Sequence, residues 1–319
     1  MPTATTDRGA LDAPRRLATP DELRRWSERC RAAGLSVGLV PTMGALHAGH
    51  RSLVRRARVD CDRVVVSIFV NPTQFAPGED IERYPRTLDA DLAVVAEDGV
   101  DAAFVPTVEA MYGPDPVTAV RVDRSLTGIL EGVHRPGHLD GVALVVAKLL
   151  IACRPHRAYF GQKDAQQSVV VRRLAADLDT GVVIVVVPVV RDHDGLAFSS
   201  RNAYLSDAER KRAVAIPTGL SAAVTAFAAG EERASVLCQL VRSPMETAGF
   251  DVDYVVAVDG ESLASVENVR RGCQILVAGR MGTTRLIDVI RLGNDAAPLD
   301  SDGPQGSEIP GVIGVQGRE

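Results

Sequence analysis

Cysteine is scarce in this chain of 319 residues. There are five, an odd number, and no two of them stand in a C-x-x-C pair. This spacing argues against a zinc ribbon and against a disulfide framework, and it is typical of a protein kept in a reducing compartment. We therefore expect a cytoplasmic location. The five are Cys30, Cys61, Cys153, Cys238 and Cys273.

Long hydrophobic runs and an excess of positive charge are also missing. The longest apolar stretches, at residues 142–153 and 181–190, are interrupted by Lys148 and Pro188 and fall short of the ~20 residues that a membrane span needs. Residues 1–16 lack the apolar segment of a secretion signal. Lys and Arg number 36 against 41 Asp and Glu, a net charge of −5, whereas a nucleic-acid-binding face is basic. We expect neither a membrane nor a nucleic acid as partner.

The first two-thirds of the chain alternates between short apolar runs and amphipathic segments. The runs resemble buried strands, and the segments between them repeat apolar residues at helical spacing. Strands are expected at 35–41, 63–70, 102–105, 157–160 and 182–189, and helices at 49–60, 87–97, 139–152 and 165–178. Continuous apolar strands that alternate with helices are typical of a mostly parallel sheet covered on both faces. The expected fold class is therefore α/β with a doubly wound sheet.

After residue 190 the order changes to helices followed by strands. The pattern predicts a long helix from 206 to 229, a second helix at 234–248, and strands at 252–258, 274–278 and 283–289. This order is typical of a smaller α+β domain. Low apolar periodicity at one end and a high Gly and Pro content at the other predict disordered tails. The expected division is a tail at 1–17, domains at 18–189 and 190–293, and a tail at 294–319.

A glycine-bearing turn joins the first expected strand to the next helix and reads P-T-M-G-A-L-H-A-G-H at residues 41–50. Free N–H groups and the helix dipole make such a turn an anion site. Gly44 and Gly49 have Walker A spacing, but His50 and Arg51 follow where Lys and Ser or Thr would stand. Two imidazoles beside a phosphate could neutralise the charge that builds up during phosphoryl displacement. An ordinary turn with incidental histidines is an alternative. Zinc is a weaker one, because the H-x-x-H spacing is one residue short of a helical pair.

Two further clusters carry candidate chemistry. In F-G-Q-K-D-A-Q-Q at 160–167 a strand again leads into a helix, and Lys163 stands at the carboxyl end of the strand, the usual ligand edge of a doubly wound sheet. In G-L-A-F-S-S-R-N at 195–202 two hydroxyls and an arginine precede a helix and could close over a polyphosphate. The plain alternatives are a solvated lysine and a helix-capping stretch.

Six motifs, taken together and in order, resemble the pantothenate synthetase (pantoate–β-alanine ligase) family. The resemblance covers about residues 18–293, and six separate motifs are far more specific than any one of them. They are P-T-M-G-A-L-H-x-G-H at 41–50, S-I-F-V-N-P-T-Q-F at 67–75, Y-P-R-T at 84–87, R-P-G-H at 135–138, F-G-x-K-D at 160–164 and S-S-R-N at 199–202.

The resemblance implies a fold and a reaction. The family belongs to the nucleotidyltransferase superfamily, whose members carry a Rossmann-like domain. Its reaction converts ATP and pantoate to pantoyl adenylate and pyrophosphate, after which β-alanine displaces AMP to give pantothenate, a coenzyme A precursor. The resemblance further implies Mg²⁺ as the metal and a homodimer as the assembly. We expect the C-terminal α+β domain to act as a lid that excludes water from the adenylate.

The resemblance also assigns roles to individual residues. It places His47 and His50 on the phosphates of ATP, with His50 as proton donor, and Asp91 on the side of the Mg²⁺ ion. Gln74 and Gln167 match the two glutamines that hold pantoate, next to which β-alanine must bind. The other implied ATP contacts are Met43, Gly44, Gly161, Lys163, Asp164, Val190, Phe198, Ser199, Ser200 and Arg201, and Lys163 with 199–201 are also expected to be catalytic.

The chain departs from the family's usual residues in places, and two other functions stay open. Gln162 stands where Glu is usual, and Ala90 and Val94 offer no oxygen to the expected metal. A nucleotidyltransferase that stops after joining a nucleotide to a phosphorylated acceptor would share the H-x-G-H signature, but Gln74 and Gln167 suit such an acceptor poorly. A nucleotide-binding module without chemistry would share the loops. A tRNA synthetase is disfavoured by the net charge.

Overall fold

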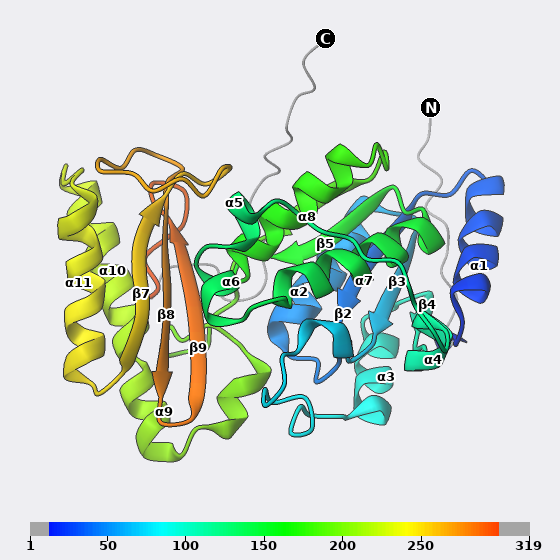
Figure 1. Ribbon diagram of the computed structural model, residues 1–319, viewed down its shortest axis with the longest axis horizontal. Coiled ribbons are helices and arrows are strands. Elements are labelled where there is room, and N and C mark those ends of the chain that lie inside the picture. Colours follow the sequence, from blue (N-terminus) through cyan, green and yellow to red (C-terminus); the bar gives the residue numbers. More distant parts are fainter. Residues whose placement is uncertain (1–12, 300–319) are drawn as a thin grey trace, which may run out of the picture.

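The structure is a computed structural model that describes residues 13–299, and it is built on two separate β-sheets (Figure 1). A large parallel sheet occupies the right half of the view and a small antiparallel sheet the left half. The expected α/β class, with a smaller sheet-containing part towards the C-terminus, is confirmed.

The large sheet has six strands, and each registered pair of neighbours runs parallel. The order across the sheet is β1-β4-β3-β2-β5-β6. From β2 the chain builds to one side through β3 and β4, and it then builds to the other side through β5 and β6. The direction of winding therefore switches between β2 and β5, and ligands of α/β sheets bind at such a switch, outside the carboxyl ends of the strands. The strands are β1 (Arg15–Leu17), β2 (Val37–Thr42), β3 (Arg63–Ile68), β4 (Ala102–Phe104), β5 (Arg157–Gly161) and β6 (Val183–Val187).

Helices cover both faces of this sheet because its strands are apolar on both sides. Along β3, Val65 faces the core under α1, α7 and α8, whereas Val64 and Val66 face the core under α2 and α3, as alternate residues of a strand must. Three short helices lie between β4 and α7. The helices are α1 (Pro20–Ala32), α2 (Ala48–Asp60), α3 (Leu88–Glu97), α4 (Val108–Tyr112), α5 (Arg124–Thr127), α6 (Glu131–His134), α7 (His138–Cys153) and α8 (Ala165–Asp177).

The small sheet is antiparallel, in the order β7-β8-β9, and packs on α10 and α11 around a core of its own. The single helix expected over 206–229 is wrong, because α9 and α10 are separate and meet at Val214. Pro217 explains the break, since proline has no N–H for the carbonyl four residues earlier and its ring crowds that carbonyl. The elements are α9 (Asp207–Ala213), α10 (Ala215–Ala228), α11 (Ala234–Thr247), β7 (Asp251–Val258), β8 (Gln274–Met281) and β9 (Thr284–Arg291).

Both expected tails contain residues with defined contacts. Residues 15–17, assigned above to a disordered tail, form β1, and Leu17 is buried where that strand pairs with β4. Residues 294–299 include the buried Ala297 and also Asp295, whose carboxylate accepts a hydrogen bond from the amide of Gln162. Both expectations are wrong for these residues because their partners lie far away in the sequence. Residues 1–12 and 300–319 of the expected tails lie outside the described residues.

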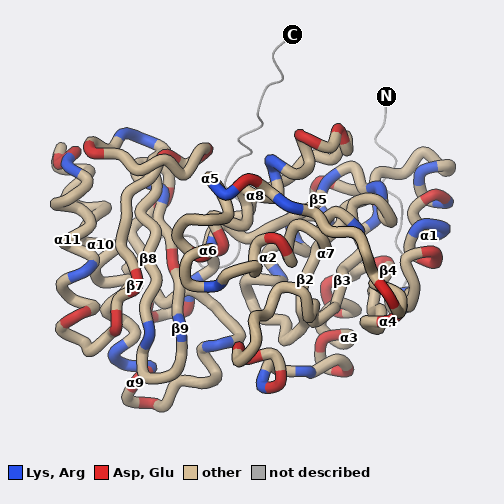
Figure 2. Tube along the Cα trace, viewed as in Figure 1, with Lys and Arg blue, Asp and Glu red and all other residues tan. Residues whose placement is uncertain are grey.

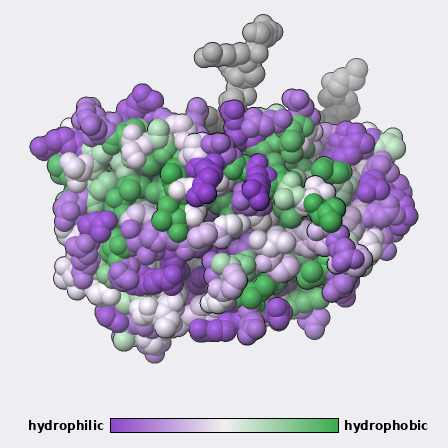
Figure 3. Space-filling model, viewed as in Figure 1, coloured by the Kyte–Doolittle hydropathy of each residue, from purple (hydrophilic) through white to green (hydrophobic). Residues whose placement is uncertain are grey.

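Charges of both signs are interspersed along the chain, and α1 alone carries several of each (Figure 2). Hydrophobic and hydrophilic residues are mixed in the same way on the face that Figure 3 shows. Among the helices of the described part, none has the length and apolar character to cross a membrane.

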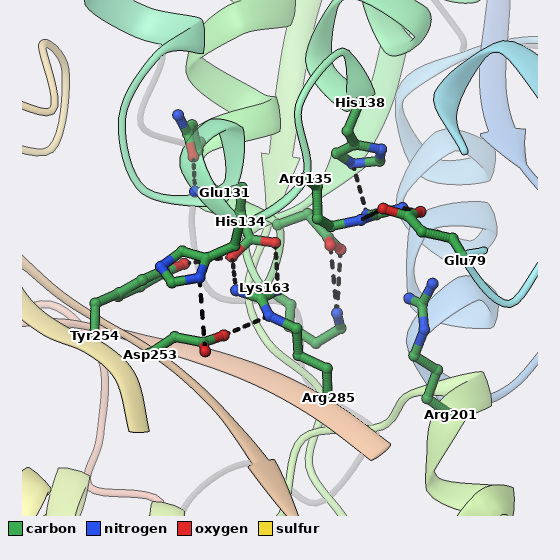
Figure 4. Close-up of polar contacts among 12 residues, drawn as sticks. Glu79, Glu131, His134, Arg135, His138, Lys163, Arg201, Asp253, Tyr254 and Arg285 are labelled. Atoms are coloured by element: carbon green, nitrogen blue, oxygen red, sulfur yellow. Dashed lines mark hydrogen bonds and ion pairs between the residues drawn. The ribbon is translucent and has the colours of Figure 1, made fainter. Parts of the chain in front are cut away.

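A buried network of charged side chains joins the two parts of the molecule (Figure 4). Arg285 on β9 contacts Glu131 on α6 through two N–O pairs of 2.7 and 2.8 Å, and it contacts Asp253 on β7 at 2.6 Å. The hydroxyl of Tyr254 also donates to Glu131, at 2.6 Å. Burial raises the pKa of Glu131, but the hydrogen bonds and charge of Arg285 outweigh burial and bring this pKa down to about 2. The small sheet is thus held against α6 by an ion pair with little contact with water.

Replacing Glu131 by glutamine is expected to lower the free energy of unfolding at pH 7 by about 3 kcal/mol, because a buried arginine loses one of its two carboxylates. The pKa of Glu131 lies below its ordinary 4.5 in the folded protein, so its stabilisation is present above that pH and is lost as the pH falls towards 2. Denaturant unfolding of both proteins at several pH values measures the difference, which should shrink over that interval.

The exposed pair Arg173–Asp177, with side chains 65% and 56% exposed, supplies the control. Asp177→Asn is expected to change the free energy of unfolding by less than about 0.5 kcal/mol. Equal effects of the two substitutions would contradict the role given to the buried network.

Candidate active site

A crevice lies at the carboxyl ends of β2 and β5, where the direction of winding switches. It holds two neighbouring cavities of about 210 and 350 Å³ that share part of their lining. The smaller, which we call the inner cavity, is lined from β2, α2, α7, β5 and residues 188–201. The larger, the outer cavity, lies between loop 78–83, the α6–α7 region and strands β8 and β9.

The candidate residues named from the sequence gather at the inner cavity, although they come from four distant segments. Gly44 and Asp91 are the exceptions, because neither residue lines the cavity. Those that line it are Met43, His47, His50, Gln74, Gly161, Lys163, Asp164, Gln167, Val190, Phe198, Ser199, Ser200 and Arg201. Their individual roles stay predictions, but the chain places them within reach of one ligand.

The turn between β2 and α2 does not present the free N–H groups that we expected of it. The carboxylate of Asp91 accepts the N–H of Ala45 at 3.0 Å and the N–H of Leu46 at 2.7 Å. The expectation that these backbone groups cradle a phosphate is therefore wrong, because a carboxylate of the protein already binds them. These two N–H groups are therefore not available to an anion in the inner cavity.

The two imidazoles of this turn are both hydrogen-bond donors towards a ligand. Nδ1 of His50 accepts the N–H of His47 at 3.3 Å, and Nδ1 of His47 accepts the N–H of Gly49 at 3.2 Å, which together cap α2. A neutral imidazole whose Nδ1 accepts carries its proton on Nε2. The ring centroids lie 4.0 Å apart. The pair therefore offers two Nε2–H donors without formal charge.

Burial keeps both histidines neutral. Burial and then the charge of Lys163 lower the pKa of His47 to about 4. Burial, the neighbouring His47 and Lys163 lower the pKa of His50 well below its ordinary value. Close to neutral pH, two uncharged rings thus face a lysine ammonium. A bound polyanion would favour their protonated forms and raise both pKa values.

The end of β5 places a cation and an amide at the crevice. The Nζ atom of Lys163 lies 3.3 Å from a carboxylate oxygen of Asp164. Gln162 is buried, and its amide donates to the carboxylate of Asp295. A glutamate at position 162 would place two like charges in contact there, which raises the energy of both. The glutamine that departs from the family pattern is therefore compatible with the carboxylate of Asp295 beside it in this chain.

The two candidate glutamines differ in how firmly they are held. The Oε1 atom of Gln74 accepts the amide of Asn71 at 3.0 Å, and its Nε2 lies 3.0 Å from the sulfur of Met43. Gln167 stands in the first turn of α8 and lines both cavities. Within residues 13–299, its side chain forms no hydrogen bond, so its amide is available to a ligand.

The R-P-G-H motif at 135–138 fixes the turn that carries Gln74, a role that the sequence did not reveal. Nδ1 of His138 lies 2.8 Å from the carbonyl oxygen of Gln74 and therefore carries the proton, while Arg135 donates to Nε2 at 3.0 Å and pairs with Glu79 at 2.6 Å (Figure 4). Gly141 on the same helix allows the close approach, because a Cβ there would overlap the backbone of the turn. The motif is visible in the sequence, but its structural partner Gln74 lies 64 residues earlier, so the contact between them could not be inferred.

The segment at 199–201 is held by the loop that follows Gln74. Arg201 contacts both carboxylate oxygens of Asp80, at 2.9 and 3.0 Å. The hydroxyl of Tyr84 lies 3.5 Å from Oγ of Ser200. Burial raises the pKa of Asp80, but Arg201 outweighs it and keeps this pKa below the ordinary value. The loop thus supplies a counterion to the arginine expected on the phosphates, and no pattern in the sequence indicated it.

Comparison with known proteins places the chain in one family. The model of the pantoate-beta-alanine ligase family matches residues 15–291. The pantothenate synthetase of Acidobacterium capsulatum is 48% identical over 295 residues, which cover 89% of this chain and 98% of that protein. The bifunctional pantoate ligase/cytidylate kinase of Gloeobacter violaceus is also 48% identical over 88% of this chain, which spans only 55% of that longer protein.

Solved structures agree with the sequence comparison. Pantothenate synthetase from Thermus thermophilus has a TM-score of 0.81 and 44% identity, over 87% of this chain and 99% of that one. Pantoate-beta-alanine ligase from Francisella tularensis, solved with beta-gamma ATP and beta-alanine, has a TM-score of 0.71 and 30% identity, over 88% and 98% of the two chains.

The neutral state of His47 leads to a stability prediction. Its pKa of about 4 lies below the ordinary 6.5, so the unfolded chain binds more protons between these values and the free energy of unfolding falls as the pH drops through them. The contribution of this residue is on the order of 3 kcal/mol. His47→Asn keeps a capping acceptor and removes the titration, so denaturant unfolding at pH 7 and pH 4.5 should show a shallower loss of stability in the variant.

The exposed His193, with 87% of its side chain accessible, is the matched control. His193→Asn should leave the pH dependence of the wild type unchanged. The same pH dependence in wild type and His47→Asn would contradict the neutral, buried state of His47.

Proposed function

Because the chain belongs to the pantoate–β-alanine ligase family and is an ATP-dependent ligase of pantoate and β-alanine, we propose that it works through an enzyme-bound pantoyl adenylate. The observation that carries the proposal is the gathering of the family's motif residues around one cavity at the switch between β2 and β5. That cavity combines hydrogen-bond donors suited to phosphate oxygens with two side-chain amides suited to a hydroxy acid.

The first step is a displacement at phosphorus. A carboxylate oxygen of pantoate forms a bond to the α-phosphorus of ATP, and the bond from that phosphorus to the bridging oxygen breaks, so that pyrophosphate leaves with the electron pair. Positioning the oxygen in line is the main task of the protein in such a reaction. The product is a mixed anhydride, which activates a carboxylate that is otherwise a poor acylating agent.

The second step transfers the acyl group to an amine. The nitrogen of β-alanine attacks the carbonyl carbon of the adenylate, the bond from carbon to the phosphate oxygen breaks, and AMP leaves. The amine loses a proton as the amide forms. No covalent bond to the enzyme is required, so Ser199 and Ser200 act as hydrogen-bonding groups.

The basic and imidazole groups act on the phosphates. The Nε2–H groups of His47 and His50 donate to phosphate oxygens, and Lys163 supplies a full positive charge beside them. Negative charge builds up on the departing pyrophosphate. Nδ1 of His50 could take up a proton only if it lost the hydrogen bond that it accepts from the N–H of His47. The proton that His50 donates to the phosphates is therefore the one on Nε2. Arg201 either exchanges Asp80 for a phosphate or donates to both anions at once. Such preorganised donors are a main source of rate acceleration.

Pantoate lies between the two glutamines. Asn71 donates to the side-chain oxygen of Gln74 and orients its amide, while His138 holds the backbone carbonyl of the same residue. Gln167 is free to turn towards a hydroxyl or carboxylate oxygen. Hydrogen bonds to such a small polar substrate provide specificity, because an analogue that lacks a hydroxyl leaves buried amide groups unpaired.

Magnesium enters with ATP as part of the substrate. In the described part of the chain there is no group of three or more His, Cys, Asp or Glu side chains that could hold a metal ion. Asp91, the expected carboxylate, binds backbone N–H groups with both of its oxygens. The residues present therefore do not fit a metal site built by the protein.

The remaining parts of the proposal concern closure of the crevice, cellular location and assembly. Residues 190–293 close the crevice from the side of the small sheet, whose strands β8 and β9 line the outer cavity, and they exclude water from the adenylate. A cytoplasmic location is supported by the five cysteines, all of which are free, since free thiols suit a reducing compartment. A homodimer is proposed on the family resemblance.

Oxygen labelling tests the adenylate directly. With both carboxylate oxygens of pantoate labelled with ¹⁸O, one label is expected in the phosphate of AMP and the other in the amide carbonyl of pantothenate, because the bond that breaks in the second step leaves the bridging oxygen on phosphorus. Mass spectrometry of the products measures this. Label in pyrophosphate or in free phosphate would contradict activation at the α-phosphorus.

A further inference from the structure

The turn between β2 and α2 is shaped as an anion-binding nest. Gly44 and Ala45 both have left-handed backbone conformations, with φ of 85° and 50°. The turn points neighbouring N–H groups at one spot, which favours a negative charge there. The two N–H groups concerned belong to Ala45 and Leu46, and they converge on Asp91.

Asp91 is built into the protein at this spot. It lies in the first turn of α3, its exposed fraction is 3%, and the hydroxyl of Thr87 donates to one of its oxygens at 3.2 Å. A Cβ on Gly44 would lie 2.9 Å from Oδ2 of Asp91, so the close approach depends on glycine. The carboxylate thus has three donors from the protein and is nearly out of contact with water.

The turn that Asp91 holds carries the residues expected to bind ATP. Met43 lies at the start of the turn and contacts Gln74, while His47 lies at its end and caps α2 together with His50. A shift of this turn would move both imidazoles, because His47 is only one residue beyond the anchored N–H of Leu46. Catalytic groups have to be held within a fraction of an ångström by the groups around them.

We propose that Asp91 is a positioning residue that anchors the ATP-binding turn, and that it is not a ligand of Mg²⁺. Oδ2 accepts from Ala45 and Thr87 and Oδ1 accepts from Leu46, so this buried carboxylate has at most one lone pair left for a metal ion. Displacing any of the three donors would leave a buried group unpaired, which is costly. Mg²⁺ also requires several oxygen ligands in strict geometry, and the neighbours Ala90 and Val94 supply none. The inference rests on the proposed function in one respect, namely that the ligand of the turn is ATP.

Asp91→Asn tests the proposal, because the amide keeps one acceptor oxygen and turns a donor towards the other N–H group. Calorimetry with α,β-methylene ATP is expected to show binding weakened at least about tenfold, because the turn loses one hydrogen bond to a charged group. The loss should be equal in EDTA and in excess Mg²⁺. Hydrogen exchange of the amides of Ala45 and Leu46 in the free protein should be faster in the variant.

The exposed Asp89 in the same helical turn supplies the control, since Asp89→Asn makes the same change of charge and should alter neither binding nor exchange. If Asp91→Asn does not fold, Thr87→Val keeps the carboxylate and removes one donor. That variant is expected to weaken binding about threefold, again equally with and without Mg²⁺.

Each outcome decides one claim. A folded Asp91→Asn protein that loses affinity only when Mg²⁺ is present overturns the anchor and indicates a metal ligand. One that loses no affinity overturns the anchor without supporting a metal ligand. A wild-type protein that fails to bind the ATP analogue overturns the proposed function instead. In that case the exchange of the Ala45 and Leu46 amides, which needs no nucleotide, still decides whether Asp91 anchors the turn.

Discussion

Two uncharged imidazoles within the electrostatic influence of a lysine ammonium are the arrangement on which the rest of this site depends. Burial and Lys163 lower the pKa values of His47 and His50, and the cap of α2 needs their Nδ1 lone pairs. The result is a cavity with donors and positive charge but few negative groups. Such a cavity is complementary to a polyphosphate, and the protein pays for that complementarity with stability at acid pH.

The fold brings these groups together through its topology. Since β2 and β5 are neighbours and the winding direction changes between them, the turn after β2 and the lysine after β5 meet at one edge. Asp91 then fixes the turn, and the R-P-G-H motif fixes Gln74 through the carbonyl oxygen of that residue. The ion pair between Glu131 and Arg285 keeps the small sheet at the outer cavity. Long-range contacts therefore supply the precision that the loops alone lack.

The sequence predicted the large sheet well because its strands are buried on both faces, and such strands appear as continuous apolar runs. It did not predict β1, a strand of three residues that exists only because β4 lies beside it. The break at Val214 was overlooked although Pro217 was visible. In the site, motifs named the residues around the inner cavity, but Asp80 and Arg201 lie 121 residues apart, and no periodicity links such a pair. The anchoring role of Asp91 could not be inferred for the same reason.

Exchange of labelled pyrophosphate into ATP tests the central claim most directly, which is that this cavity activates pantoate at the α-phosphorus of ATP. In the absence of β-alanine, the account predicts exchange that requires pantoate and Mg²⁺, and that falls at least about 100-fold in Lys163→Met because a charge that stabilises the leaving group is removed. Lys211→Met, on the exposed surface of α9, should exchange normally. Nucleotide binding without any pantoate-dependent exchange would contradict the account.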